Sequence, residues 1–361
     1  MTTKQYLALG LMTALGTLVA LSMKPYLGEA GQMGPNYKVL APISRGNLTI
    51  FPVVADSTHE TGKFLTLDEG VRSGEVVVSE AGSIRPLVRR REGYIPSDGA
   101  EVNRLVLVNN SARPLILLAG EIVTGGKQDR VVGKDRIVPP KSDPIDLAVF
   151  CVEPERWVAT KSSFGSFHSQ MAQPSVRRSA MANKDQVKVW ADVHSASESL
   201  GMAASAPAAQ EMSKTSSYAG VMANDEVKLR VDSVAVPLEQ SYLGVMRELR
   251  ERNAVGVVVA VNGNMIWADI FASTPLLEKY WPKLIRSYAA EALTQSKSAK
   301  SPDAKEAQAF LEDFGTRHEA QETEPGVFRR TERTGDDFTA FALTSLLPGT
   351  GFDVHIAKMV D

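Results

Sequence analysis

Between Lys38 and Trp157, hydrophobic and polar positions follow one another in short runs that are typical of β-strands. Turn-forming residues such as Asn109-Asn110-Ser111 and Pro139-Pro140 separate these runs. The runs are NLTIFPVV, EVVVSE, RLVLVN, PLILLAG, RIVPP and IDLAVFCVE. Many short strands at this spacing predict a β-sandwich or a barrel-like unit, with one short helix in FLTLDEGVRSG.

The second half of the chain has helical periodicity and one predicted hairpin. Residues 183–200 are expected to form a helix whose packing face carries Val187, Trp190 and His194. A second helix is expected at 238–253. The Asn262-Gly263 pair between two apolar runs then predicts a β-hairpin over 254–271.

A long helix is expected over TPLLEKYWPKLIRSYAAEAL, residues 274–293. Thr274 is the candidate cap and Pro275 the first helical position, while Pro282 should kink the helix or mark its true start. Residues 158–182 are expected to form a long loop, 203–217 a flexible linker and 294–308 an exposed segment. The fold class is therefore α+β, with a β-sandwich- or barrel-like N-terminal half and a β-hairpin plus long-helix C-terminal half.

The N-terminal residues 6–23 carry no charge, with Lys4 before them and Lys24 after them. This pattern fits a signal peptide, with Ala20-Leu21-Ser22 as a small-x-small cleavage pattern, or a short membrane anchor. Because roughly 20 apolar residues are needed to cross a bilayer, the length is borderline. A buried core helix is the alternative. We expect export across the bacterial inner membrane to the periplasm or beyond, or anchoring in that membrane through residues 6–23.

The predicted organisation has three parts. Residues 1–23 are a signal peptide or membrane anchor, and residues 24–44 are a linker and first strand. Residues 45–358 are one domain, which contains a β-rich part at 45–157, a helical and linker insertion at 158–236 and an α/β part at 237–358.

Charge and cysteine content exclude several function classes. The net charge of −2 argues against a general nucleic-acid binder. Cys151 is the only cysteine, so an intrachain disulfide and a cysteine metal cluster are both excluded. The five histidines are scattered without a metal-binding spacing, and no metal site is predicted. The sequence indicates no particular cofactor and no oligomeric state.

The stretch GEIVTGGKQDR, residues 120–130, invites comparison with a phosphate-binding loop. The comparison fails because Gly126 stands where the lysine is needed and a strand-like run follows in place of a helix. A dense polar set remains: Glu121, Lys127, Gln128, Asp129 and Arg130. Lys127 and Arg130 are candidates for binding an anion, and Gln128 for reading an amide or hydroxyl. A polar turn is the alternative.

A second polar stretch is FCVEPERW, residues 150–157. On a strand, Glu153 shares an apolar face with Cys151, and a carboxylate there is costly unless it is paired. Arg130 and Arg156 are the candidate partners. Cys151 is expected to be a buried, inert thiol and Trp157 a core residue, whereas a nucleophilic role and a stacking role are the alternatives.

Together, GE-x-x-x-GGKQDR and the later CVE-x-x-RW resemble the bacterial ARG-and-rhodanese-phosphatase-superfamily-associated protein domain. The resemblance covers roughly residues 45–358 and includes an Asp-x-Phe element at Asp269 before a long helix with a tryptophan. The chain departs from the family pattern at Asp129, where asparagine is expected, and at Glu155, where glycine is expected. The resemblance implies ADP-ribose, NAD-related or phosphorylated ligands.

Three hypotheses follow. The first is an exported ligand-binding domain for a phosphorylated or nucleotide-like, ADP-ribose-type ligand. Its site would consist of Glu121, Lys127, Gln128, Asp129, Arg130, Glu153 and Arg156. The second is a hydrolase in which Glu121 or Glu153 is the general acid or base. The third is a structural envelope protein whose polar cluster is an internal ion-pair network.

Overall fold

The computed structural model describes residues 36–80, 103–154, 164–165, 170–248, 253–295, 302–313 and 315–361. The predicted signal or anchor segment at 6–23, Arg156 and Trp157 lie outside these residues. Contacts divide the chain into residues 1–33 and 34–361, and the second unit is the one described below. Within the described residues, no helix has the length and apolar character needed to cross a bilayer.

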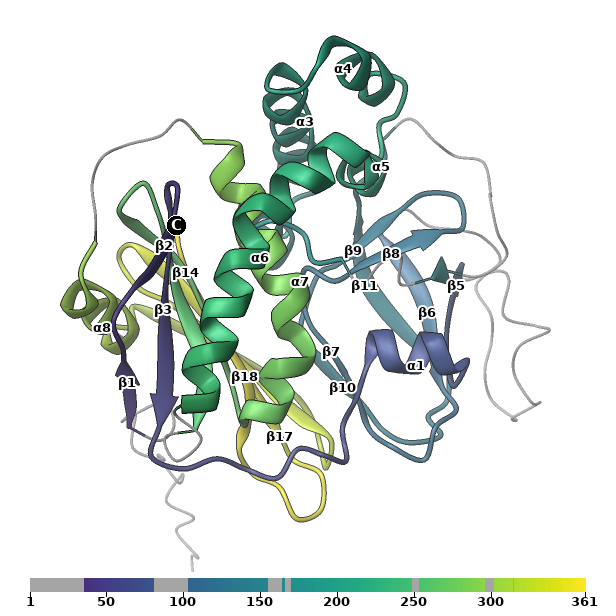
Figure 1. The fold of residues 1–361 in the computed structure, drawn as a ribbon. Coiled ribbons are helices and arrows are strands. Elements are labelled where there is room, and N and C mark those ends of the chain that lie inside the picture. Colours follow the sequence, from purple (N-terminus) through teal and green to yellow (C-terminus); the bar gives the residue numbers. More distant parts are fainter. Residues whose placement is uncertain are drawn as a thin grey trace, which may run out of the picture. The chain divides into compact units, whose positions relative to one another are not determined.

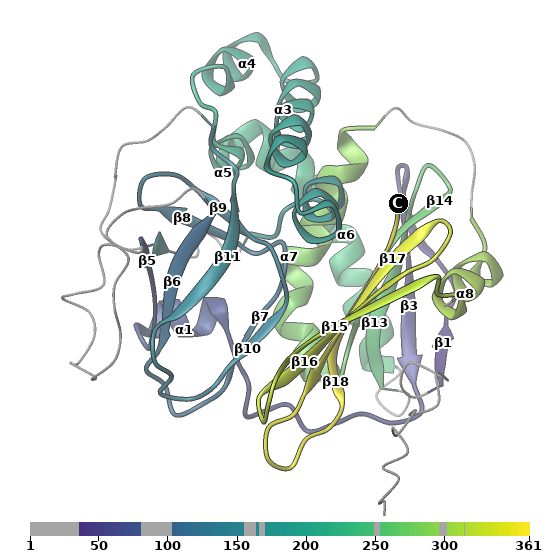
Figure 2. The same cartoon turned by 180° about the vertical axis from the view of Figure 1, so that it is seen from behind.

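A nine-stranded antiparallel sheet forms one half of this unit (Figures 1 and 2). Its order is β1 (Tyr37–Val39), β3 (Leu48–Ala55), β13 (Ala254–Val261), β14 (Asn264–Phe271), β18 (Asp353–Val360), β17 (Phe338–Ser345), β16 (Phe328–Thr334) and β15 (His318–Glu324), while β2 (Ile43–Arg45) also pairs with β3. The sheet therefore joins strands from the beginning, middle and end of the described chain. The predicted hairpin β13–β14 is confirmed, and its turn residues Asn262 and Gly263 both have positive φ, as a two-residue hairpin turn requires.

Two long helices, α6 (Asp225–Glu248) and α7 (Thr274–Leu293), pack together over one face of this sheet (Figure 1). Aromatic rings fill the contact, with Tyr242 of α6 and Trp281 of α7 having ring centroids 4.2 Å apart. The predicted cap of α7 was wrong by one residue, because the hydroxyl of Ser273 caps the helix and Thr274 bonds to the carbonyl of Ala254. Pro282 lies inside a continuous helix and does not mark its start.

A closed six-stranded barrel forms the other half and confirms the barrel-like prediction. It consists of β5 (Val76–Glu80), β6 (Arg104–Asn109), β12 (Phe164–Gly165), β8 (Ile122–Gly125), β9 (Arg130–Val132) and β11 (Ile145–Cys151). A smaller sheet of β4 (Leu65–Thr66), β7 (Leu115–Leu117) and β10 (Arg136–Val138), together with helix α1 (Leu67–Ser73), lies against it. The barrel has its own aliphatic core, and the chain is α+β as predicted.

Three segments predicted to be irregular contain helices. They are α2 (Pro174–Arg178) with the π-helix η3 (Ser179–Asn183), α4 (Ala206–Met212), and α8 (Ala304–Glu312). These short helices are stabilised mainly by tertiary contacts, since each buries part of its surface; in α8, Asp303 also forms a capping box, and Ala307 and Leu311 are buried. The predicted loop, linker and exposed segment are therefore corrected at these positions.

Helix α3 (Gln186–Met202) confirms the helix predicted at 183–200 but presents another face to the core. The side chains of Val187 and His194 are 69% and 75% exposed, so the predicted packing face was wrong. The packing face carries the smaller residues Val189, Val193, Ala196 and Leu200, which allow close contact with the barrel and α5 (Tyr218–Ala223).

Candidate functional site

The turn between β8 and β9 gathers several of the predicted site residues. The backbone N–H of Asp129 donates to Oε2 of Glu153 (2.9 Å), and the amide of Gln128 donates to the Glu153 carbonyl (3.0 Å). The carboxylate of Asp129 accepts from the N–H of Gly125 (3.1 Å) and from the hydroxyl of Ser217 (2.6 Å). The cluster therefore fastens the end of β11 and the start of α5 to the turn.

Two basic residues of this turn have partners in the same region. The backbone N–H of Lys127 donates to Oε1 of Glu80 (2.8 Å). Arg130 is fully buried and lies opposite Cys151 in the β9–β11 register. Burial raises the pKa of the Cys151 thiol, which disfavours the nucleophilic thiolate. The cavities described below are lined by other residues.

Glu121 takes a separate position, at the other end of β8. One carboxylate oxygen accepts from Nζ of Lys283 (2.5 Å), and the other accepts from the backbone N–H of Leu118 (2.7 Å). The Lys283 ammonium also donates to Oδ2 of Asp68 (2.6 Å). We call Lys283, Glu121 and Asp68 the Lys283 triad; it connects α7 with the β7–β8 turn and with α1.

The Lys283 triad places an ammonium between two carboxylates in a nearly dry environment. Burial raises the pKa of Glu121, and the neighbouring Lys283 only partly opposes this effect. Burial by itself would lower the pKa of Lys283, but attraction to Glu121 and Asp68 raises it above the usual range. Lys283 is therefore a cation at neutral pH and not a nucleophilic amine.

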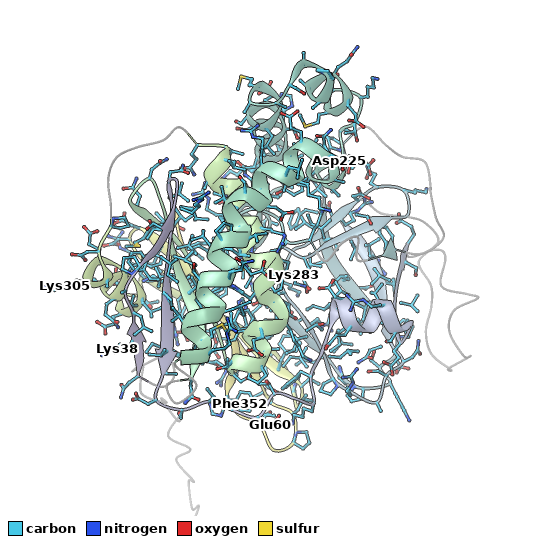
Figure 3. The ribbon with its side chains drawn as sticks, in the orientation of Figure 1. Lys38, Glu60, Asp225, Lys283, Lys305 and Phe352 are labelled. Carbon is cyan, nitrogen blue, oxygen red and sulfur yellow. The ribbon has the colours of Figure 1, made fainter. Side chains whose placement is uncertain are left out.

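Lys283 projects from α7 (Figure 3). It lines two cavities beside this helix. The α5–α7 cavity, of about 420 Å³, is bounded by α5, α6, α7 and the Gln170-Met171 segment. The α1–α7 cavity, of about 470 Å³, is bounded by α1, α6 and α7. Arg286 also lines both cavities, and it is held by Asp232 (2.9 Å) and Glu239 (3.1 Å) of α6.

The wall of the α5–α7 cavity combines apolar and polar groups. Met171, Met222 and Val231 supply its apolar part. Lys228 lines it from α6, is exposed, and forms no ion pair within the described part of the chain. The side-chain oxygen of Gln170 is buried without a hydrogen-bond partner, so this wall can accept a hydrogen bond from a ligand.

A second buried charge cluster lies between the barrel and the sheet. His355 of β18 bonds Asp135 through Nδ1 (2.6 Å) and Asp269 of β14 through Nε2 (3.0 Å). Arg177 of α2 donates to both oxygens of Asp269 (2.9 and 3.0 Å), and the hydroxyl of Tyr288 also donates to Asp269. We call His355, Asp135, Asp269 and Arg177 the His355 tetrad.

The His355 tetrad contains two basic and two acidic side chains. The pKa shifts of His355 and Asp269 follow from the partners that they contact. Desolvation opposes the charge on His355, but Asp135 and Asp269 raise its pKa from 6.5 to about 9. Burial would raise the pKa of Asp269, yet Arg177 and His355 hold it well below the usual range. His355, Asp269 and Arg177 are therefore charged at neutral pH.

Sequence reasoning grouped Glu121 with the polar residues of the β8–β9 turn and missed its partners. Lys283 and Asp68 lie 162 and 53 positions from Glu121 in the chain, and nothing local connects them. One usable signal was Lys283 itself, a lysine among Tyr280, Leu284 and Ser287 on the apolar face of a predicted helix. The structure brings together Gln128, Asp129, Arg130 and Glu153, while Glu121 belongs to the Lys283 triad.

Within the described residues no cluster of potential metal ligands is present.

Comparison with known proteins gives one match. The family model ARPP-1, described as the ARG and Rhodanese-Phosphatase-superfamily-associated Protein domain, matches residues 36–358. Neither the comparison with curated proteins nor the comparison with solved structures found a match.

Proposed function

The chain belongs to the ARG and Rhodanese-Phosphatase-superfamily-associated Protein domain family, and we propose that it is a small-molecule-binding domain whose site is the α5–α7 cavity. The ligand is a phosphorylated or nucleotide-like molecule. The protein is exported across the bacterial inner membrane or anchored in it.

The observation that carries this proposal is the position of the Lys283 ammonium. An ammonium has three N–H donors, and Glu121 and Asp68 occupy two of them. Lys283 nevertheless lines the cavity. Its ammonium also lies 4.5 Å from the centroid of the Tyr280 ring, a weaker contact that a ligand oxygen can replace. The two carboxylates keep the ammonium charged and fixed in direction, which favours a charge-assisted hydrogen bond to phosphate or carboxylate.

The size and lining of the cavity support a ligand of this class. Its volume of about 420 Å³ lies within the roughly 300–1,000 Å³ that is common for small-molecule sites. Lys228 adds positive charge, whereas the charge of Arg286 is offset by Asp232, which lines the cavity together with Asp225. Met171, Met222 and Val231 offer an apolar surface for a ring. A molecule with a phosphate at one end and a flat apolar part at the other matches both regions.

A thermal-shift screen of the chain without residues 1–23 tests the proposal. The panel comprises nucleotides, ADP-ribose, sugar phosphates and simple carboxylates. A ligand at about 100 times its dissociation constant stabilises the protein by roughly 2.7 kcal/mol. The shift should be lost in Lys228→Ala and kept in the control Lys188→Ala, which replaces an exposed lysine of α3.

Two outcomes contradict this placement of the site. A shift that survives Lys228→Ala but disappears in Lys127→Ala moves the ligand to the β8–β9 turn. If no panel member shifts the melting temperature, the domain does not bind ligands of this class.

The N-terminal segment supports export. Its uncharged run at 6–23 precedes the compact unit, which begins at Gly34. Cell fractionation and N-terminal sequencing test this part. A mature chain that begins near residue 23 indicates a signal peptide, and an intact chain in the membrane fraction indicates an anchor. An intact chain in the cytosol contradicts both.

Hydrolysis is the second candidate, because burial raises the pKa of Glu121 beside a cavity-lining lysine. In that case Glu121→Gln should abolish turnover even at concentrations of the compound that saturate the variant. The matched control is Glu153→Gln, whose carboxylate lies at the β8–β9 turn. Equal turnover in Glu121→Gln and the unaltered protein excludes this role.

A further inference from the structure

The turn between β7 and β8, residues 118–121, is held by carboxylates from two different clusters. The N–H of Leu118 donates to Oε2 of Glu121 (2.7 Å), which belongs to the Lys283 triad. The next N–H, of Ala119, donates to Oδ1 of Asp135 (2.7 Å), which belongs to the His355 tetrad. Two adjacent backbone groups therefore connect the two buried charge clusters.

The same turn also contacts the wall of the α5–α7 cavity. The carbonyl of Gly120 accepts from the N–H of Ala172 (2.8 Å), and the carbonyl of Ala172 accepts from the hydroxyl of Ser287 (2.7 Å), which lines the cavity. A Cβ at Gly120 would lie 2.5 Å from Cγ of Arg177, so the turn also rests on the His355 tetrad. The β7–β8 turn therefore contacts both the wall of the α5–α7 cavity and the His355 tetrad.

His355 is fully buried, and both of its ring nitrogens face carboxylate oxygens. This geometry needs a hydrogen on each nitrogen, and therefore a protonated ring. The charged or titratable groups around it are Asp135, Asp269 of β14, and Arg177 of α2 and Tyr288 of α7, which bond to Asp269. The neutral ring of Phe271 packs beside it, with centroids 4.8 Å apart.

We propose that His355 and Asp135 are positioning residues for the ligand site: protonated His355 holds Asp135, Asp135 holds the β7–β8 turn, and the turn directs Glu121 toward Lys283. Deprotonation of His355 releases this chain of contacts and frees the Lys283 ammonium. The relevance to binding rests on the proposed function, but the contacts themselves do not.

The release follows from hydrogen-bond counting. A neutral imidazole has one N–H, so it can donate to Asp135 or to Asp269 but not to both. Asp269 keeps its bonds to Arg177 and Tyr288 in either case. Asp135 loses its cationic partner in either case, and where the neutral ring donates to Asp269 it retains only the Ala119 N–H among these groups. Asp135 then carries a buried, poorly compensated charge, which favours opening of the turn toward water.

Pulse acetylation of the full chain without ligand tests the coupling, with mass spectrometry of each lysine as the readout. The measured quantity is the labelling rate of Lys283 divided by that of Lys228, which lines the same cavity but has no link to the turn. Below pH 8 we expect a low ratio. The ratio should rise on the order of tenfold with a midpoint near pH 9, the pKa of His355, because labelling follows the population of the open state.

Three variants at pH 8 separate the coupling from a general loosening. Glu121→Gln removes the direct partner and should raise the ratio, and His355→Gln should raise it similarly. Asp135→Asn should keep the ratio low up to pH 10, because its amide accepts from Ala119 through oxygen and donates to neutral His355 through nitrogen.

A ratio that rises in Glu121→Gln but stays low in His355→Gln overturns the inference. If His355→Gln does not fold, the pH series on the unaltered protein decides, and a ratio that stays flat from pH 7.5 to 10 overturns it. Because no ligand is present, either result leaves the proposed binding function untouched.

Discussion

Asp269→Asn isolates the contribution of the buried His355 tetrad to stability. Each carboxylate oxygen of Asp269 accepts two hydrogen bonds, one from Arg177 and one from either His355 or Tyr288. An asparagine has one oxygen, so its NH₂ group faces two donors in either orientation. The substitution also leaves the buried Arg177 guanidinium without its counter-charge.

The magnitude follows from these losses. Breaking a buried ion pair from one side costs about 3–5 kcal/mol, which agrees with two unsatisfied donors at about 1–3 kcal/mol each. An unfolding entropy of roughly 2.1 cal/mol/K per residue over the Gly34–Asp361 unit converts this cost to a melting temperature about 4–7 °C lower.

Thermal unfolding followed by circular dichroism measures the effect. Asp146→Asn is the matched control, because its carboxylate bonds Arg104 (2.9 Å) while its side chain is 59% exposed. Exposed pairs contribute about 0–1 kcal/mol, so the control should change the melting temperature by about 1.5 °C or less. Equal losses in Asp269→Asn and Asp146→Asn would refute the assignment of stability to the buried tetrad.

Other predictions concern pH, a turn and the cysteine. The pKa of His355 is about 9 in the folded protein, compared with 6.5 for an unperturbed histidine, so its contribution to stability is complete below pH 6.5 and is lost as the pH rises through 9. The melting temperature should therefore fall between pH 6.5 and 9, and this fall should be absent in His355→Gln. Gly120→Ala should cost about 2–5 kcal/mol in urea unfolding, because φ is +97° and the new Cβ meets Arg177, whereas Gly46→Ala, with φ +63° and open space, should cost about 1–2 kcal/mol. Cys151 should react with a disulfide reagent only at the rate of unfolding, since it is buried with a raised pKa; rapid reaction in native buffer would contradict this.

Local sequence patterns predicted the elements whose intrinsic conformational preference matches their surroundings in the fold. Asn262-Gly263 specifies its own turn, and strands β5 and β6 carry runs of aliphatic residues that are mostly buried. Helix α3 shows the limit of this reasoning. Its sequence offers two apolar faces, and contact with the barrel selects the one with Val189 and Val193 over the one with Val187.

The candidate site was only partly predictable, for a physical reason. Gln128, Asp129 and Glu153 come together because β9 and β11 are antiparallel neighbours, and the start of β9 lies beside the end of β11. The partners of Glu121 come from α1 and α7, and such contacts depend on how the barrel meets the helices of the sheet. Periodicity along a chain contains no information on that docking.

The pairing of β3 with β13 has a consequence for synthesis of the chain. About 200 residues, including the whole barrel, separate Ala55 at the end of β3 from its partner strand at Ala254. At roughly 5–20 residues per second, a ribosome needs about 10–40 s to make that stretch. During this interval β3 has an unpaired edge, while the barrel can already close on itself. The N-terminal strands are therefore the segment most in need of a chaperone or of delayed folding.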